Sequence, residues 1–151
     1  SYGVERIEDA DLEEIEKLLA EKKLPLKRQE IPNNQSLYQG TFQIAPGKSI
    51  PFGVVIVNGE EMADFQISFK RLAYLSNYAD KEKILDLIND LNNSKTFYYR
   101  VCLAGDGEIY MKAMGKTTED VRAMYEQLVI GSSIAKRVIE EVEKIIVPPA
   151  E

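Results

Sequence analysis

A glycine-lysine-threonine run late in the chain has the residue types of a phosphate-binding site. Gly115, Lys116 and Thr117 match the last three positions of the pattern G-x-x-x-x-G-K-[ST], in which backbone N–H groups and the lysine hold phosphate oxygens. The first glycine of this pattern would stand at the position of Tyr110. Without it the backbone cannot turn successive N–H groups towards a phosphate, and the two acidic residues that follow the run would repel a nucleotide.

The same run is typical of the beginning of a helix. Thr117 can cap the first turn, and Asp120 follows three residues later, as in a capping box. Acidic side chains at that end also interact favourably with the helix dipole. We therefore expect a helix to begin at Thr117. A small-molecule or nucleotide-responsive regulatory domain that uses this segment is the alternative to the function inferred below.

The residue composition removes much catalytic chemistry. The chain of 151 residues has no histidine and one cysteine, Cys102, so no Ser–His or Cys–His pair can form and a zinc site is disfavoured. No convergent set of carboxylate, lysine and tyrosine side chains is visible in the sequence. We therefore expect no enzymatic activity, no cofactor and no metal.

The stretch from Phe97 to Met114 predicts a β-hairpin, because apolar residues alternate with others on both sides of a glycine-rich turn. Placing the apolar residues of both strands on one side requires Leu103 to face Ile109. That register leaves a three-residue loop ending at Gly107, which takes the left-handed conformation that such loops need. The residues expected on the buried side are Phe97, Tyr99, Val101, Leu103, Ile109, Met111 and Ala113.

The outer side of this hairpin has the composition of an interface. Its residues are Tyr98, Arg100, Cys102, Tyr110, Lys112 and Met114. Arg100 faces Lys112 in the inferred register, and like charges directly opposite one another destabilise a sheet. Tyrosine, methionine and arginine are enriched at interfaces. We expect these side chains either to contact an acidic-aromatic protein partner or a second copy of the chain, or to be covered by a helix of the same chain with a glutamate over the two cations.

Charge and hydropathy bound the kinds of partner. A net charge of −6 and the lack of a basic stripe make nucleic-acid binding unexpected. The longest apolar runs, 54–57 and 145–147, fall far short of the roughly 20 residues that span a bilayer, so no membrane partner is expected. A single cysteine cannot form an internal disulfide, which fits the reducing conditions of the cytoplasm.

Hydrophobic periodicity predicts one α+β domain over residues 1–151, with its ordered core at about residues 8–146. Apolar residues recur at helical spacing over 9–23. Pro25 and Pro32 then mark a loop of roughly a dozen residues, which is long for a connection inside a compact domain.

The remaining chain predicts a sheet and two further helices. Alternation predicts the strands of an antiparallel three-stranded meander at 38–44, 52–57 and 65–69. The strand at 52–57 is apolar on both faces, as a central strand would be. Helices are predicted over 80–92 and 117–146, before and after the hairpin. Gly131 falls inside the last helix, where it indicates a bend or a close contact with the sheet.

The inferred order of helix, three strands, helix, two strands and long helix resembles the type III secretion chaperone-like fold and, within it, the YbjN-like family of small bacterial proteins. The similarity covers about residues 8–146 and is clearest from Tyr98 to Leu128. There a strand, the turn GDGEIYM, a second strand and an amphipathic helix follow one another. The chain departs from the family in its proline-containing loop and in the GKTT start of its last helix.

The resemblance implies a binding module. Proteins of this fold are small, acidic and often dimeric, and they hold an extended segment of a partner against the sheet or helix surface. The implied function is a non-enzymatic protein-interaction module, chaperone-like or regulatory, in a bacterial cytoplasm, with a protein or peptide partner and a homodimer as the expected assembly. The family supplies no catalytic residues to carry over.

Overall fold

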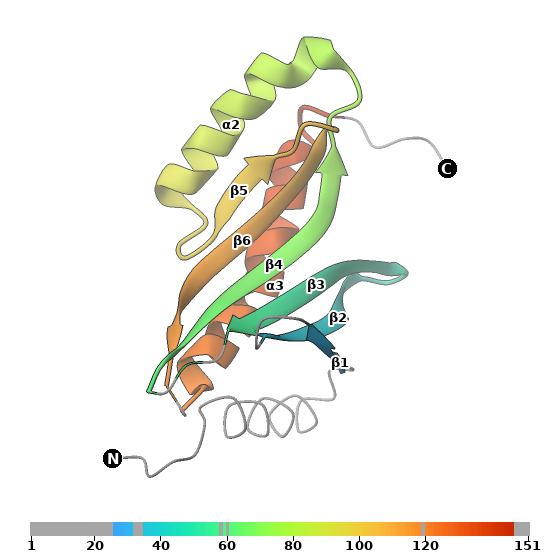
Figure 1. Ribbon diagram of the computed structural model, residues 1–151. Coiled ribbons are helices and arrows are strands. Elements are labelled where there is room, and N and C mark those ends of the chain that lie inside the picture. Colours follow the sequence, from blue (N-terminus) through green and yellow to red (C-terminus); the bar gives the residue numbers. More distant parts are fainter. Residues whose placement is uncertain (1–25, 32–34, 58, 60, 119, 147–151) are drawn as a thin grey trace.

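A computed structural model gives the structure of the protein over residues 26–31, 35–57, 59, 61–118 and 120–146. Within these residues the chain is an α+β structure with a six-stranded antiparallel sheet and two α-helices (Figure 1). The helix predicted over 9–23 lies outside the described residues.

In the order in which they lie side by side, the strands are β1 (Leu26–Ile31), β2 (Gln35–Ala45), β3 (Lys48–Val57), β4 (Ala63–Tyr74), β6 (Glu108–Thr117) and β5 (Arg100–Leu103). The helical elements are a short 3-10 helix, η1 (Tyr78–Asp80), and the α-helices α2 (Lys81–Ser94) and α3 (Arg122–Val142). In Figure 1, α3 crosses behind the sheet, whereas α2 lies beside β5 at one end.

The predicted meander is confirmed as β2, β3 and β4. Tyr38 pairs with Val54, and Val54 pairs with Ile67, so the alternating apolar residues of all three strands share one face. These three side chains are buried. The period of two in the sequence therefore places the core side of the sheet correctly.

The segment predicted as a long loop contains a strand, β1. Leu26 pairs with Gly40, and Ile31 pairs with Gln35. The prolines at positions 25 and 32 flank this strand in the sequence, so every residue within it keeps the N–H that a ladder needs. The described order is four strands, helix, two strands and helix, with one strand more than predicted.

The prediction that Thr117 caps the last helix is wrong. Thr117 is the final residue of β6, pairs with Ala63 and is buried, and α3 begins only at Arg122. Pairing along β4 extends the backbone at 115–117, and this tertiary contact outweighs the local preference for a cap. The same pairing means that the glycine-lysine-threonine run does not form a phosphate-binding loop. The Lys116 ammonium instead lies 2.7 Å from the Asp64 carboxylate.

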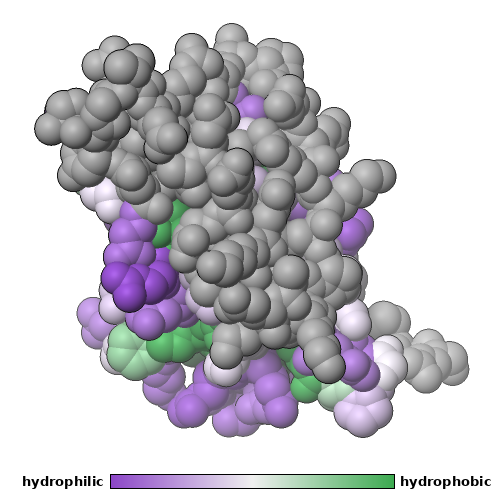
Figure 2. Space-filling model, turned by 90° about the horizontal axis from the view of Figure 1, so that it is seen from below, coloured by the Kyte–Doolittle hydropathy of each residue, from purple (hydrophilic) through white to green (hydrophobic). Residues whose placement is uncertain are grey.

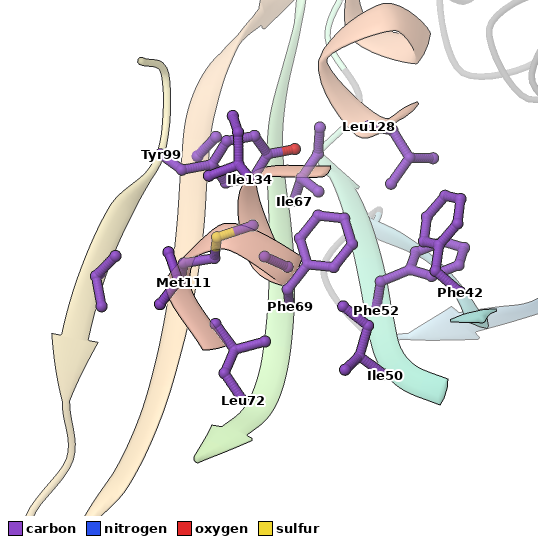
Figure 3. Packing of buried hydrophobic residues seen from close by; sticks show 14 of the residues in the cluster. Phe42, Ile50, Phe52, Ile67, Phe69, Leu72, Tyr99, Met111, Leu128 and Ile134 are labelled. Carbon is purple, nitrogen blue, oxygen red and sulfur yellow. The ribbon is translucent and has the colours of Figure 1, made fainter. Parts of the chain in front are cut away.

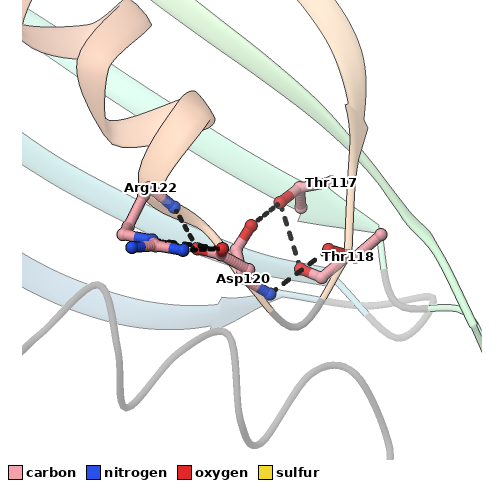
Figure 4. A network of polar contacts seen from close by, with 4 residues as sticks. All are labelled: Thr117, Thr118, Asp120 and Arg122. Carbon is pink, nitrogen blue, oxygen red and sulfur yellow. Dashed lines mark hydrogen bonds and ion pairs between the residues drawn. The ribbon is translucent and has the colours of Figure 1, made fainter.

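Asp120 serves the first turn of α3 (Figure 4). Its carboxylate accepts the backbone N–H of Arg122 at 3.1 Å and binds the Arg122 guanidinium, with Nη2 at 2.6 Å. These contacts lower the pKa of Asp120 to about 2. The Thr118 hydroxyl accepts the Asp120 N–H at 3.3 Å.

Viewed from below, the coloured surface at this end of the molecule is mostly hydrophilic, with smaller hydrophobic areas between (Figure 2).

The helix predicted over 80–92 is confirmed as α2, and its last turn is joined to β5. The Asn92 side chain accepts the Val101 N–H at 2.7 Å and donates to the Val101 carbonyl at 3.0 Å. The Thr96 hydroxyl donates to the Tyr99 carbonyl at 2.7 Å. Asn92 thus satisfies backbone groups on the outer edge of β5, which removes part of an otherwise free sheet edge.

The core lies between α3 and one face of the sheet (Figure 3). The Phe69 ring is at its centre, with ring centroids 5.8 Å from Phe42, 6.0 Å from Phe52 and 5.7 Å from Tyr99. The Tyr99 hydroxyl donates to the Gln127 carbonyl of α3 at 2.6 Å, and burial raises the pKa of this phenol. A buried aromatic cluster with one satisfied hydroxyl therefore joins the sheet to the helix.

Gly131 confirms the prediction of a close contact between the last helix and the sheet. A Cβ at this position would overlap the Phe69 ring and the Tyr99 hydroxyl. The lack of a side chain therefore lets the backbone of α3 approach the aromatic cluster directly.

We predict that Gly131→Ala destabilises the protein by about 1–3 kcal/mol, because the added methyl group overpacks the contact with Phe69 and Tyr99. An exposed helical glycine would show the opposite sign, since alanine is the better helix former by about 1 kcal/mol. Urea unfolding measures the difference. Ser133→Ala, on the exposed side of the same helix, is the control and should stay within about 0.5 kcal/mol of wild type. A Gly131→Ala protein as stable as wild type would contradict the contact.

Candidate protein-interaction surface

The sheet face opposite α3 is covered by neither described helix, and we call it the open face. It consists of the side chains on β2, β3, β4, β6 and β5 that alternate with the core residues. Cross-strand pairing arranges its centre in two rows: Leu37, Val55, Gln66 and Met114, and then Gln39, Gly53, Ser68, Lys112 and Arg100. All of these residues are exposed or half-buried. Figure 1 shows the sheet with α3 on its far side.

The hairpin register inferred from the sequence is confirmed. Leu103 pairs with Ile109, and Arg100 pairs with Lys112. Gly107 has a φ of +96°, and the Ala104 N–H donates to the Glu108 carbonyl at 2.8 Å across the loop. The two cations therefore stand directly opposite one another on the open face, as predicted.

Cys102 pairs with Tyr110 in the next position of the same hairpin face. The negative charge that the Cys102 thiol gains on ionisation raises the pKa of the Tyr110 phenol, and burial adds to the effect. Met114 lies further along β6 and is 68% exposed. The structure thus gathers all the predicted interface residues of β5 and β6 on one face.

Tyr98 does not join this group. β5 begins only at Arg100, and Tyr98 lines a shallow hollow with residues of α3, including Ala123 and Ile130. The prediction that Phe97 is buried is also wrong, because this residue is 80% exposed and has a φ of +48°. The left-handed turn at Phe97 breaks the alternation that the sequence pattern assumed to continue.

The alternative of a covering helix is not met within the described residues. α2 lies along the β5 edge and α3 on the opposite face, so neither places a glutamate over Arg100 and Lys112. Neither cation forms an ion pair in the part of the chain that the structure describes.

A bulge in β4 adds cations that sequence reasoning missed. Phe69 pairs with Met111 and Ala73 with Ile109, so the three residues between them on β4 stand opposite one residue of β6. Arg71 in this bulge has a φ of +54°, and its N–H donates to the Glu108 carboxylate at 2.8 Å. The bulge leaves two successive residues of β4, Lys70 and Arg71, exposed. A signal was present, since buried Phe69 and Leu72 are three residues apart in a strand of period two.

A hollow of about 670 Å³ opens on this face. Gly53 and Ser68 are paired across β3 and β4 and both border it. The other side chains that line it include Leu37, Gln39, Pro51, Val55, Gln66, Lys70, Arg71, Tyr74 and Glu108. Apolar groups, amides and cations thus surround one open hollow, a combination suited to holding a ligand with both apolar and anionic parts.

The described residues form neither a metal site nor a membrane-spanning helix. No group of three or more His, Cys, Asp or Glu side chains there could hold a metal ion. Neither of the α-helices described is long and apolar enough to cross a membrane. The chain matches no protein-family model and no curated protein sequence.

We predict that Lys112→Glu raises the free energy of unfolding by about 0.2–1 kcal/mol, because it replaces a like-charge pair with Arg100 by an opposite-charge pair. Chemical denaturation at low and high salt measures the effect, which should shrink as salt screens the charges. Lys112→Gln is the matched control, since it removes the repulsion without adding attraction, and its effect should be smaller. A Lys112→Glu protein less stable than Lys112→Gln at low salt would show that Lys112 already has a carboxylate partner.

Proposed function

We propose that the chain is a non-enzymatic protein-interaction module of bacterial type, chaperone-like or regulatory, and that its partner binds the open face. The observation that carries the proposal is the direct opposition of Arg100 and Lys112, neither of which has an ion pair among the described residues. This pair works against folding. A partner carboxylate placed between the two cations would turn the repulsion into binding free energy.

The apolar residues of the open face support the same proposal. β3 lies in the middle of the sheet, and its Val55 side chain is half-buried beside Leu37 of β2. The described helices cover only the other side of β3. Tyr110 and Met114 extend the apolar surface along β6, and side chains of these types are enriched where proteins meet. A partner would bury this area on binding.

The resemblance to YbjN-like proteins agrees with a surface of this kind, since proteins of the type III secretion chaperone-like fold hold a partner segment against the sheet or helix surface. The partner in the proposal is a protein or peptide, and a second copy of the chain is included. Fold similarity alone does not assign a function. The support therefore comes mainly from the charges and apolar side chains of the open face.

A small-molecule-responsive regulatory domain is the second candidate. The observation that favours it is the hollow of about 670 Å³ on the open face, a volume in the usual range for ligand sites. The glycine-lysine-threonine run would have no part in such a site, because 115–117 is paired within the sheet.

Affinity capture from native lysate tests the leading proposal. We expect the wild-type chain to retain a stoichiometric protein partner, and the Tyr110→Ala/Lys112→Ala variant to lose it. Circular dichroism checks that the variant remains folded.

Tyr98→Ala is the matched control, because Tyr98 is an exposed tyrosine of the same region that lies beside α3. It should capture the partner as wild type does. Equal capture by all three proteins would place the site elsewhere, and the absence of any partner or second copy with wild type would contradict an interaction module.

A further inference from the structure

Neither backbone conformation nor packing among the described residues requires a glycine at Gly53 of β3. Its φ is not in the left-handed region, and a Cβ there would meet its nearest neighbours, Leu37 Cδ1 and the Tyr38 carbonyl oxygen, at an ordinary 3.7 Å. Glycine inside a strand is destabilising. At Gly115, by contrast, a Cβ would come within 2.8 Å of the Phe65 ring. At Gly131 a Cβ would overlap the Phe69 ring and the Tyr99 hydroxyl. Gly115 and Gly131 therefore allow close packing within the chain. No such close contact is found at Gly53 among the described residues.

The missing side chain deepens the open face at one place. Gly53 pairs with Ser68, another small residue, and the Ser68 hydroxyl accepts a hydrogen bond from the Gln66 amide at 3.2 Å. Longer side chains flank this pair in the row, with Gln39 on β2 and Lys112 on β6. The result is a recess at the middle of the row, and glycine in a strand is common where a ligand or another chain approaches closely.

The two sides of the recess differ in chemistry. Leu37 and Val55 border it towards one end of the strands, whereas Lys70 and Arg71 line it towards the β4 bulge. Lys112 stands beside Ser68 in the next strand. The carboxylate that lines the hollow, Glu108, is engaged by the Arg71 N–H. An apolar border therefore lies across the recess from a cluster of cations.

This asymmetry favours an acidic protein segment over a nucleic acid. The cations named above lie on β4, β6 and β5, while a nucleic acid would need a longer basic track and would meet a chain of net charge −6. The apolar border offers nothing to a phosphate backbone. A peptide that alternates apolar and acidic side chains matches both sides.

We infer that the open face binds an acidic peptide segment of a partner protein, with one apolar side chain of the segment seated over Gly53 and its flanking carboxylates paired with Lys70, Arg71 and Lys112. The inference rests on the proposed function and names the chemistry of its partner. Gly53 supplies the space for the anchor, and the β4 bulge supplies two cations beside it.

Selection from a random-peptide phage library on the wild-type chain tests this chemistry directly. We expect the selected peptides to be enriched in Asp and Glu together with Leu, Ile or Phe, and their affinity to fall as salt rises. Gly53→Val should weaken the binding of these peptides by at least about tenfold, since a branched side chain fills the recess. Its unfolding midpoint should be no lower than that of wild type, because valine suits a strand better than glycine.

Three further variants keep the test decisive. Gly53→Ala fills less of the recess and should weaken binding by a smaller factor, so it replaces Gly53→Val if the larger residue disturbs the sheet. Lys70→Gln/Lys112→Gln should also weaken binding by about tenfold or more. Lys83→Gln, an exposed lysine of α2, is the matched charge control and should bind as wild type does.

The outcomes separate this inference from the proposed function. Acidic peptides that lose binding with the Lys70/Lys112 variant but not with Gly53→Val would overturn the anchor over Gly53 and leave the open face as the binding surface. Peptides that none of the open-face variants affects would overturn both. Selection of no peptide, or of peptides without acidic residues, would overturn the inference, as would a thymidine oligonucleotide that binds more tightly than the selected peptides.

Discussion

The absence of a side chain at Gly131 sets how closely α3 approaches the sheet, and the rest of the structure depends on that contact. Because the helix backbone meets Phe69 and Tyr99 directly, the aromatic cluster is sealed from water on this side. Burial of apolar area, the main source of folding free energy, is therefore concentrated between α3 and one sheet face. The strands of the sheet carry a second set of side chains, and the described helices leave that set uncovered.

The open face has features that folding alone does not explain. Arg100 and Lys112 oppose one another, Arg71 adopts a left-handed backbone in the bulge, and Gly53 leaves a recess where larger residues would fit. Each of these features costs stability in the isolated chain. Their position on one surface supports a common use, in which an anionic and partly apolar partner offsets the cost.

The sequence predicted what depends on local periodicity and missed what depends on distant contacts. The hairpin register followed from Leu103 and Ile109, because a one-residue slip would turn the apolar residues of one strand away from the core. The position of Thr117 in β6 was not predicted, because it depends on pairing with Ala63, more than fifty residues earlier in the chain. Within the candidate surface, the sequence predicted correctly that Arg100 and Lys112 stand opposite one another. Lys70 and Arg71 were missed, because a bulge is a property of two strands together.

The most direct measurement of an open, cationic sheet face uses Cys102, the one cysteine of the chain. It lies half-buried between Arg100 and the loop on β5, opposite Tyr110. The rate at which Cys102 is labelled in the native protein is measured with an anionic aromatic disulfide and with a neutral one. For each reagent, this rate is divided by the rate at which the same reagent labels the unfolded chain. If the face is open and cationic, the native thiol reacts much faster than the protein unfolds, and the anionic reagent has an advantage that disappears as salt is added. Protection of Cys102 until global unfolding, or equal normalised rates for the two reagents at all salt concentrations, would contradict an open, cationic face.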